Sequence, residues 1–116
     1  MENLDSILEV KGLDGIVIGP QDLSINLGVP EQYDNKVFLD AVDFIIGKAK
    51  EHNKSVGNHF SFNIAPELGW AQNGMNIILH SQDQVIFVNN IRNELNQFRA
   101  LLGDPLYDNN GDIILE

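Results

Sequence analysis

The segment Gly15-Ile16-Val17-Ile18-Gly19-Pro20-Gln21-Asp22-Leu23-Ser24 joins a short apolar run directly to Gly-Pro, and an acidic residue follows two positions later. Residues 15–18 are rich in β-branched side chains, which predicts a short buried strand. Such a strand presents Asp22 and bare backbone N–H groups near its C-terminal end. In α/β folds, ligands bind at this end of the strands, so these ten residues are the candidate site.

Helix and strand patterns alternate around this segment. Helical periodicity covers residues 3–9, 35–52, 64–72 and 82–102, further strands are expected at 55–60 and 75–80, and residues 19–33 have the composition of a loop. The last helix carries an apolar stripe made of Val85, Val88, Ile91, Leu95, Phe98 and Leu102. Strands that alternate with helices predict parallel βαβ units, so we expect an α/β domain with three parallel strands.

Three parallel strands are too few to form a closed barrel, which takes eight strands and about 250 residues. Two sheet edges would then keep unpaired backbone groups, a liability in water. We therefore expect either an open sheet that finds partners or one part of a larger barrel. Residues 1–103 form the expected domain, and residues 104–116, with a turn signal at Asn110-Gly111, form a separate tail or hairpin arm.

Composition excludes several classes of function. The 116 residues carry a formal net charge of −10, which argues against partners such as nucleic acid or an anionic membrane surface. The absence of cysteine excludes disulfides, zinc–thiolate sites and thiol nucleophiles. The N-terminus has no signal-peptide pattern, and no apolar run reaches the roughly 20 residues of a transmembrane helix. We expect a cytoplasmic protein.

Residues 10–24, followed by Leu27-Gly28, resemble the HpcH/HpaI family, the metal-dependent (class II) pyruvate aldolases related to citrate lyase β subunits. The family pattern Gly-Pro-x-Asp-Leu-Ser is intact, and Asn53-Lys54-Ser55-Val56-Gly57 stands where the family has Gly-Lys-x-x-Gly. The resemblance spans about residues 3–103. It implies a (β/α)₈ TIM barrel of the phosphoenolpyruvate/pyruvate superfamily type, of which this sequence is the C-terminal half with strands six to eight.

The resemblance also implies a divalent ion, Mg²⁺ or Mn²⁺, held by a Glu and an Asp. Asp22 matches that Asp, and the backbone N–H of Gln21 matches the group that meets the pyruvate carboxylate, while Gly19 and Pro20 shape the turn. The ion would stabilise the enolate of a bound pyruvate. The family's Glu ligand, catalytic His and Arg lie upstream of this segment, so the resemblance assigns no catalytic residue here.

The activity implied is reversible cleavage of a 2-oxo-4-hydroxy acid into pyruvate and an aldehyde, with the upstream residues supplied by a complementing N-terminal half-barrel chain. The alternative is a non-catalytic truncated paralogue that acts as an oligomerisation or binding module. In both cases the bare sheet edges predict association, including homo-oligomers. Taken without the resemblance, Asp22 could simply cap the turn or helix after Pro20.

Two histidines fall at the expected C-terminal ends of adjacent strands. His59 and His80 would then lie near the barrel mouth, as a proton shuttle or as replacement metal ligands. The alternative is two hydrogen-bonded loop histidines without a role in a pocket. Trp70 is expected to pack in the core or an interface.

Overall fold

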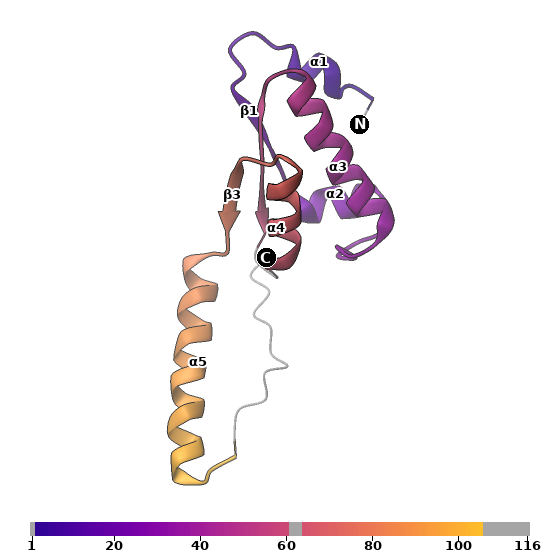
Figure 1. Ribbon diagram of the computed structural model, residues 1–116. Helices are drawn as coiled ribbons and strands as arrows, with labels where there is room; N and C mark the ends of the chain where they lie inside the picture. The colour runs from indigo at the N-terminus through magenta and orange to yellow at the C-terminus, as the bar shows by residue number, and fades with distance from the viewer. Residues whose placement is uncertain (1, 61–63, 106–116) are drawn as a thin grey trace. The chain divides into compact units, whose positions relative to one another are not determined.

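The computed structural model describes residues 2–60 and 64–105, and its elements alternate as the sequence predicts (Figure 1). In chain order these elements are α1 (Leu4–Leu8), β1 (Gly15–Ile18), α2 (Pro20–Asn26), α3 (Lys36–Glu51), β2 (Ser55–Phe60), α4 (Ile64–Asn73), β3 (Ile77–His80) and α5 (Asp83–Leu102). Two compact units divide the chain, the first ending at His80 and the second beginning at Ser81.

The sheet of the first unit has the order β1-β2-β3, with both pairs of strands parallel. The register places Ile18 beside Asn58 and Phe60 beside His80. The prediction of three parallel strands in an α/β domain is therefore confirmed. The third strand begins at Ile77, two residues later than the sequence pattern suggested, and Asn76 instead accepts a hydrogen bond from the Val56 N–H through its side chain, at 3.0 Å.

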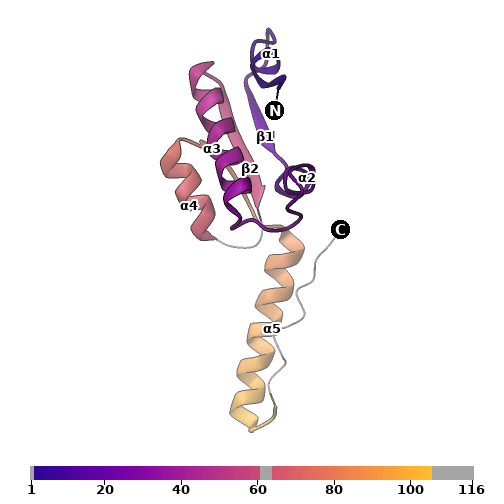
Figure 2. The ribbon, with the colours of Figure 1, turned by 90° about the vertical axis from the view of Figure 1, so that its right-hand side faces the viewer.

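Helices α3 and α4 lie on one face of the sheet (Figures 1 and 2). The apolar stripe of α3 is buried against the strands because its members recur with the period of the helix; they are Phe38, Ala41, Val42, Ile45, Ile46 and Ala49. Asn35 caps the N-terminus of this helix, because its side chain accepts a hydrogen bond from the Val37 N–H at 3.0 Å.

A cluster of aromatic rings forms one part of this core. The ring of Phe60 lies 5.2 Å from that of Tyr33 and 5.4 Å from that of Trp70, centroid to centroid, both edge to face. Phe38 joins the same cluster at 5.4 Å from Tyr33. Edge-to-face pairs are favourable beyond the area they bury, so Trp70 is a core residue, as the sequence analysis expected. Burial raises the pKa of the Tyr33 hydroxyl.

The opposite face of the sheet carries exposed apolar side chains in the part of the chain that the structure describes. Side chains alternate along a strand, so Val17 and Leu79 point away from the helical layer, and they are 55% and 47% exposed. Parallel sheets normally have both faces covered. An open face of this kind is typical of a sheet that another layer covers.

A helix, α2, occupies residues 20–26 of the segment 19–33, which the sequence analysis expected to be a loop throughout. Pro20 stands at its first position, where a missing N–H costs nothing, and Gly28, with φ at 74°, follows its end. Leu23 and Leu27, one turn apart, pack against the core. The expectation was wrong because Gly and Pro were interpreted as loop signals here, where they mark the two ends of a short helix.

The second unit contains α5, which ends at Gly103 in the left-handed conformation with φ at 77°. None of the helices in residues 2–60 and 64–105 is both long and apolar enough to cross a membrane. The predicted tail or hairpin arm at 104–116 lies, from residue 106 on, outside the described residues.

Candidate functional site

The candidate site is the turn from β1 into α2. Gly19 is extended, with φ at −89° and ψ at 102°, and its carbonyl accepts the first helical hydrogen bond, from Leu23 N–H at 2.9 Å. Pro20 is buried, whereas Gln21 and Asp22 are exposed in the first turn. The first N–H groups of a helix have no acceptor within the helix. The turn therefore places a carboxylate and backbone donors together at the C-terminal end of β1.

Gly19 and Asp22 approach each other closely across this turn. A Cβ on Gly19 would stand 3.3 Å from Oδ2 of Asp22. Glycine at this position lets the carboxylate fold back over the end of the strand. The Asp22 carbonyl also accepts a hydrogen bond from the Asn26 side chain, at 2.7 Å, one turn further along the helix.

Ser24 holds this turn in place, and the sequence analysis had assigned it no role. Its side chain is completely buried, and its hydroxyl donates to the Gln21 carbonyl at 2.8 Å. The same oxygen accepts from the Glu31 N–H at 3.0 Å, which ties α2 to the loop after it. A buried hydroxyl that both donates and accepts fixes the backbone on either side, so Ser24 positions Gln21 and Asp22.

The donor chemistry at this turn fits one ligand of a hard cation. An exposed carboxylate is the ligand that Mg²⁺ and Mn²⁺ prefer, and Mg²⁺ usually keeps several waters beside one or two carboxylates. Asp22 offers such a carboxylate. No group of three or more His, Asp or Glu side chains converges within residues 2–60 and 64–105. Within these residues Asp22 therefore offers a single carboxylate, and a metal site built on it would need its other ligands from elsewhere.

The two predicted pocket histidines lie on opposite faces of the sheet. His59 pairs in register with Leu79, and Phe60 pairs with His80. Because Phe60 is buried under the helices and His59 is exposed, His80 belongs to the helical face and His59 to the open face. Of the two, His59 shares the open face with Val17, whereas the imidazole of His80 is engaged with α4.

The partner of His80 is Glu67, which the sequence analysis had not singled out. His80 Nδ1 lies 2.6 Å from Glu67 Oε2, and Glu67 is only 5% exposed. The other carboxylate oxygen, Oε1, is buried and has no hydrogen-bond partner among the described residues. A buried carboxylate is stable only when it is paired, so His80 is needed to keep Glu67 inside. No local pattern links residues 67 and 80, because a strand end and a helix meet only in the fold.

A second group of charges lies at the other end of the sheet, where α3 ends before β2. His52 Nε2 lies 2.9 Å from Asp5 Oδ1, and Lys48 Nζ lies 3.2 Å from the same oxygen. Hydrogen bonds from His52 and then from Lys48 lower the pKa of Asp5. Glu51 first and Asp5 second raise the pKa of Lys48. These contacts join α1 to α3.

The sequence of this chain matches the model of the HpcH/HpaI aldolase/citrate lyase family over residues 1–90. Among curated relatives, 2-keto-3-deoxy-L-rhamnonate aldolase from Salmonella paratyphi A (strain ATCC 9150 / SARB42) is 30% identical over 105 residues. The matched segment is 87% of this chain and 38% of that relative. The same enzyme from Salmonella newport (strain SL254) gives the same identity and coverage. The chain thus spans less than half the length of these relatives.

Solved structures of HpcH/HpaI aldolases have a fold similar to that of this chain. An HpcH/HpaI aldolase from Desulfitobacterium hafniense DCB-2 superposes with a TM-score of 0.75 at 26% identity, over 84% of this chain and 38% of that one. An HpcH/HpaI aldolase/citrate lyase family protein from Burkholderia cenocepacia J2315 reaches 0.78 at 21% identity, with the same coverage of both chains. The predicted fold class is confirmed: the three strands and their helices match part of these aldolase folds.

Proposed function

This chain belongs to the HpcH/HpaI aldolase/citrate lyase family, and from that premise we propose that it carries one part of the site of a metal-dependent carbon–carbon lyase. The reaction is reversible cleavage of a 2-oxo-4-hydroxy acid into pyruvate and an aldehyde. The chain contributes Asp22 as a metal ligand and Gln21 as a backbone donor. The family's Glu, His and Arg would come from a complementing N-terminal half-barrel, in the same polypeptide or in a partner chain.

One observation carries this proposal, the exposure of the Asp22 carboxylate in the first turn of α2, immediately after β1. An ordinary surface carboxylate has no neighbours that fix its position. The turn that carries Asp22 is fixed by the close approach of Gly19 and by the buried hydroxyl of Ser24. A site that must hold a ligand to within a fraction of an ångström needs such support from residues with locked conformations. The rigid turn therefore favours a ligand role for Asp22.

The residues of this chain would do two things in the reaction. Asp22 would hold a divalent ion, Mg²⁺ or Mn²⁺, and the ion when bound polarises the keto oxygen of the 2-oxo acid. Gln21 N–H would donate a hydrogen bond to the substrate carboxylate and set its orientation, because the first-turn amides of α2 have no acceptor within the helix. Gly19 and Pro20 give the backbone the shape that brings the two groups together.

Association is part of the proposal. The open face with Val17 and Leu79, and the edge strands β1 and β3, present apolar side chains and unpaired backbone groups. A complementing half-barrel would cover the open face and place its own residues at the C-terminal ends of the strands. A homo-oligomer would cover part of the same surface. We also propose that the protein is cytoplasmic.

Proton-to-deuterium exchange at the pyruvate methyl group, followed by NMR in D₂O with Mn²⁺ or Mg²⁺, tests this proposal without knowledge of the aldehyde. The chain is measured alone and with a co-expressed N-terminal half-barrel from an HpcH/HpaI aldolase. We expect metal-dependent exchange in the second sample and its loss in Asp22→Ala. The matched control is Asp34→Ala, another exposed carboxylate, which should leave exchange unchanged. Equal exchange in Asp22→Ala and the control would refute the role of Asp22.

The absence of a convergent ligand set in the described residues supports a second candidate, a non-catalytic oligomerisation or binding module. The same experiment separates the two. A complex that forms with the half-barrel, is stable, and shows no exchange above the metal-only blank would favour the module. Exchange that depends on Asp22 would favour the enzyme.

A further inference from the structure

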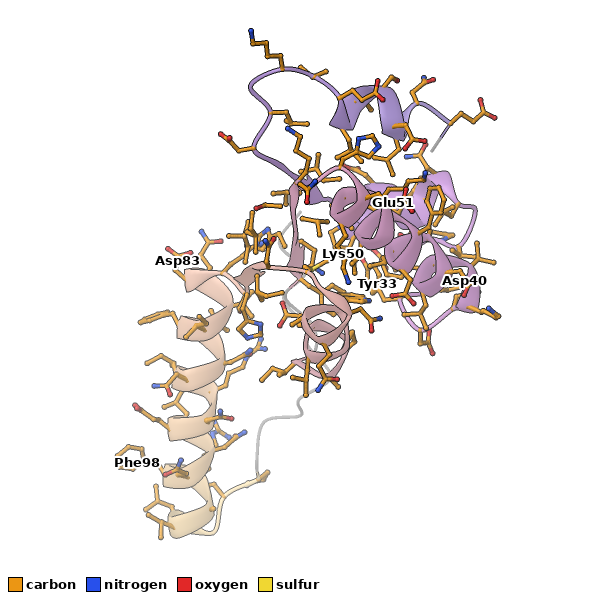
Figure 3. The ribbon with its side chains drawn as sticks, turned by 45° about the horizontal axis from the view of Figure 1, so that its top comes forward. Tyr33, Asp40, Lys50, Glu51, Asp83 and Phe98 are labelled. Carbon is orange, nitrogen blue, oxygen red and sulfur yellow. The ribbon has the colours of Figure 1, made fainter. Side chains whose placement is uncertain are left out.

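Strand β2 ends on two residues whose side chains face opposite ways. Phe60 is buried, and its ring packs at 5.2 Å against that of Tyr33, which lies on the helical side of the first unit (Figure 3). Successive side chains of a strand point to opposite faces of the sheet. His59 is exposed and therefore projects from the open face, at the C-terminal end of the strand. The sheet thus presents an imidazole at the end where the candidate site lies.

The register places His59 beside the turn that carries Asp22. Ile18 pairs with Asn58. The residues that follow them, Gly19 and His59, are therefore level with each other on neighbouring strands. Gly19 is extended, with φ at −89° and ψ at 102°, so the alternation of faces continues through it. Neighbouring strands lie about 4.8 Å apart, so groups that project from these two positions onto one face share the same space.

The Asp22 carboxylate lies on the same side of the sheet as His59. Ile18 is buried under the helices, so a Cβ on Gly19 would point to the open face. Asp22 Oδ2 would stand 3.3 Å from that Cβ. The carboxylate proposed to hold the ion and the imidazole of His59 therefore border one space, above two neighbouring strands.

The surroundings of His59 leave this space open. Gly57 lies two residues earlier on the same face of β2, and a Cβ there would come within 2.6 Å of Ile77. Only glycine fits at position 57 without a shift of the neighbouring strand, so no side chain fills the face below His59. On the side away from the turn, His59 pairs with Leu79, which is 47% exposed. The imidazole thus lies between an apolar side chain and the acidic turn.

An imidazole at this position is placed to meet the half of the substrate that the turn does not hold. In the function proposed above, Asp22 and the Gln21 N–H bind the pyruvate half through the ion and the carboxylate. The aldehyde half is joined to the methyl carbon of pyruvate, so it begins one carbon beyond the keto group. A hydroxyl group can both donate to and accept from an imidazole, whereas an alkyl group does neither.

We propose that His59 is a specificity-determining residue that forms a hydrogen bond with the aldehyde half of the substrate. It selects aldehydes that carry a hydroxyl group beside the carbonyl over alkyl aldehydes of the same size. This inference rests on the proposed function, because the pyruvate half must be bound at Asp22 first. The enolate forms before the aldehyde takes part, so His59 governs the choice of aldehyde and not the formation of the enolate.

Two aldehydes of the same size test this role, because glycolaldehyde has a hydroxyl group where propionaldehyde has a methyl group. The chain, co-expressed with the N-terminal half-barrel, is given pyruvate, Mn²⁺ and each aldehyde in turn, and kcat/KM for addition is measured. We expect the ratio of the two values to favour glycolaldehyde and to fall at least tenfold in His59→Leu. A site that bonds a hydroxyl rejects the analogue that lacks it. His59→Gln keeps a donor and an acceptor and should retain most of the ratio.

The matched control is His80→Gln. His80 lies at the same end of the sheet on the helical face, and glutamine can still donate to Glu67. This variant should leave the ratio unchanged, and circular dichroism checks that each variant is folded. A ratio that is the same in His59→Leu as in the wild-type chain, or that falls equally in His80→Gln, would overturn the role of His59.

Exchange at the pyruvate methyl group separates this inference from the function on which it rests, because exchange needs the ion and the turn but no aldehyde. Metal-dependent exchange with a ratio that is insensitive to His59→Leu would overturn the role of His59 and leave that of Asp22 standing. A wild-type complex without exchange would overturn both. Loss of exchange together with addition in His59→Leu would place His59 at the ion and not at the aldehyde, which also overturns the proposal.

Discussion

His80 Nδ1 lies 2.6 Å from Glu67 Oε2, and this contact joins the end of β3 to α4. Glu67 is 5% exposed, whereas the side chain of His80 is 46% exposed. The pair thus has one member in the core and one in contact with solvent. The contact links β3 to α4 at the C-terminal end of the strands, the end at which the candidate site also lies.

Replacement of His80 alone should destabilise the first unit more than replacement of both His80 and Glu67. His80→Ala leaves the Glu67 carboxylate buried without a partner, and we expect a loss of about 1–3 kcal/mol in the free energy of unfolding. Glu67→Gln in the His80→Ala background removes the charge and should restore part of that loss. Urea unfolding monitored by Trp70 fluorescence measures both. A double variant less stable than His80→Ala would show that the carboxylate has another partner.

Gly19→Ala should weaken metal binding without unfolding the protein. The new Cβ would stand 3.3 Å from Asp22 Oδ2, so the carboxylate must move by a few tenths of an ångström. We expect a several-fold loss of Mn²⁺ affinity in the complex with the half-barrel, measured by calorimetry, and a small change in stability. Gly47→Ala is the control, because a Cβ there meets nothing within 4 Å. It should leave affinity unchanged and stabilise α3 by about 0.5–1 kcal/mol.

Ser24→Ala should be costly although the change is small. It removes the acceptor of the Glu31 N–H and the donor to the Gln21 carbonyl in a fully buried position. An unsatisfied buried donor costs about 1–3 kcal/mol, and the turn that carries Asp22 should loosen. Ser6→Ala serves as the control, because that serine bonds only at the surface, to the Asn3 carbonyl. Similar unfolding midpoints for the two variants would contradict the structural role of Ser24.

The Asp5 contacts predict a loss of stability in acid. Hydrogen bonds from His52 and then from Lys48 lower the pKa of Asp5 in the folded chain below its ordinary value. A lowered pKa means that the contribution is fully present above the unfolded pKa and is lost as the pH falls through the folded pKa. The wild-type chain should therefore be more stable than Asp5→Asn at pH 6, and the difference should shrink as the pH falls through the lowered pKa of Asp5. Urea midpoints measured from pH 6 downwards follow this difference, and a difference that does not change with pH would show that the ionisation of Asp5 does not contribute to stability.

The sequence was a good guide wherever a signal is local. Residues 15–18 and 55–60 become β1 and β2 with the predicted bounds, and the periodic stripe at 35–52 becomes α3. Strands and helices of this kind can be predicted because their apolar residues recur every two residues in a strand and every 3.6 residues in a helix. Helix α2 was missed because a seven-residue helix has too few positions to show a period, and its capping residues resemble those of a loop.

The candidate site also has a part that the sequence could predict and a part that it could not. Gly19, Pro20, Gln21 and Asp22 are contiguous, so the sequence alone could indicate them as a unit. The sequence could not show whether the two histidines lie together. It predicts His59 and His80 at the ends of adjacent strands, but the register of β2 against β3 sets them on opposite faces. A shift of one residue in that register would have reversed the result.

By itself the sequence determined the alternation of strands and helices, the acidic turn after the first strand, and the apolar stripe of the last helix. These features depend on residues within a few positions of one another, where sterics and backbone hydrogen bonding act. Only the tertiary structure decided that Ser24 supports the turn, that His80 is paired with Glu67, and that the sheet leaves Val17 and Leu79 open. The Ser24 contacts span only three and seven residues, but they depend on how α2 meets the loop after it. The other two features exist only once the strands are in register and the helices are packed.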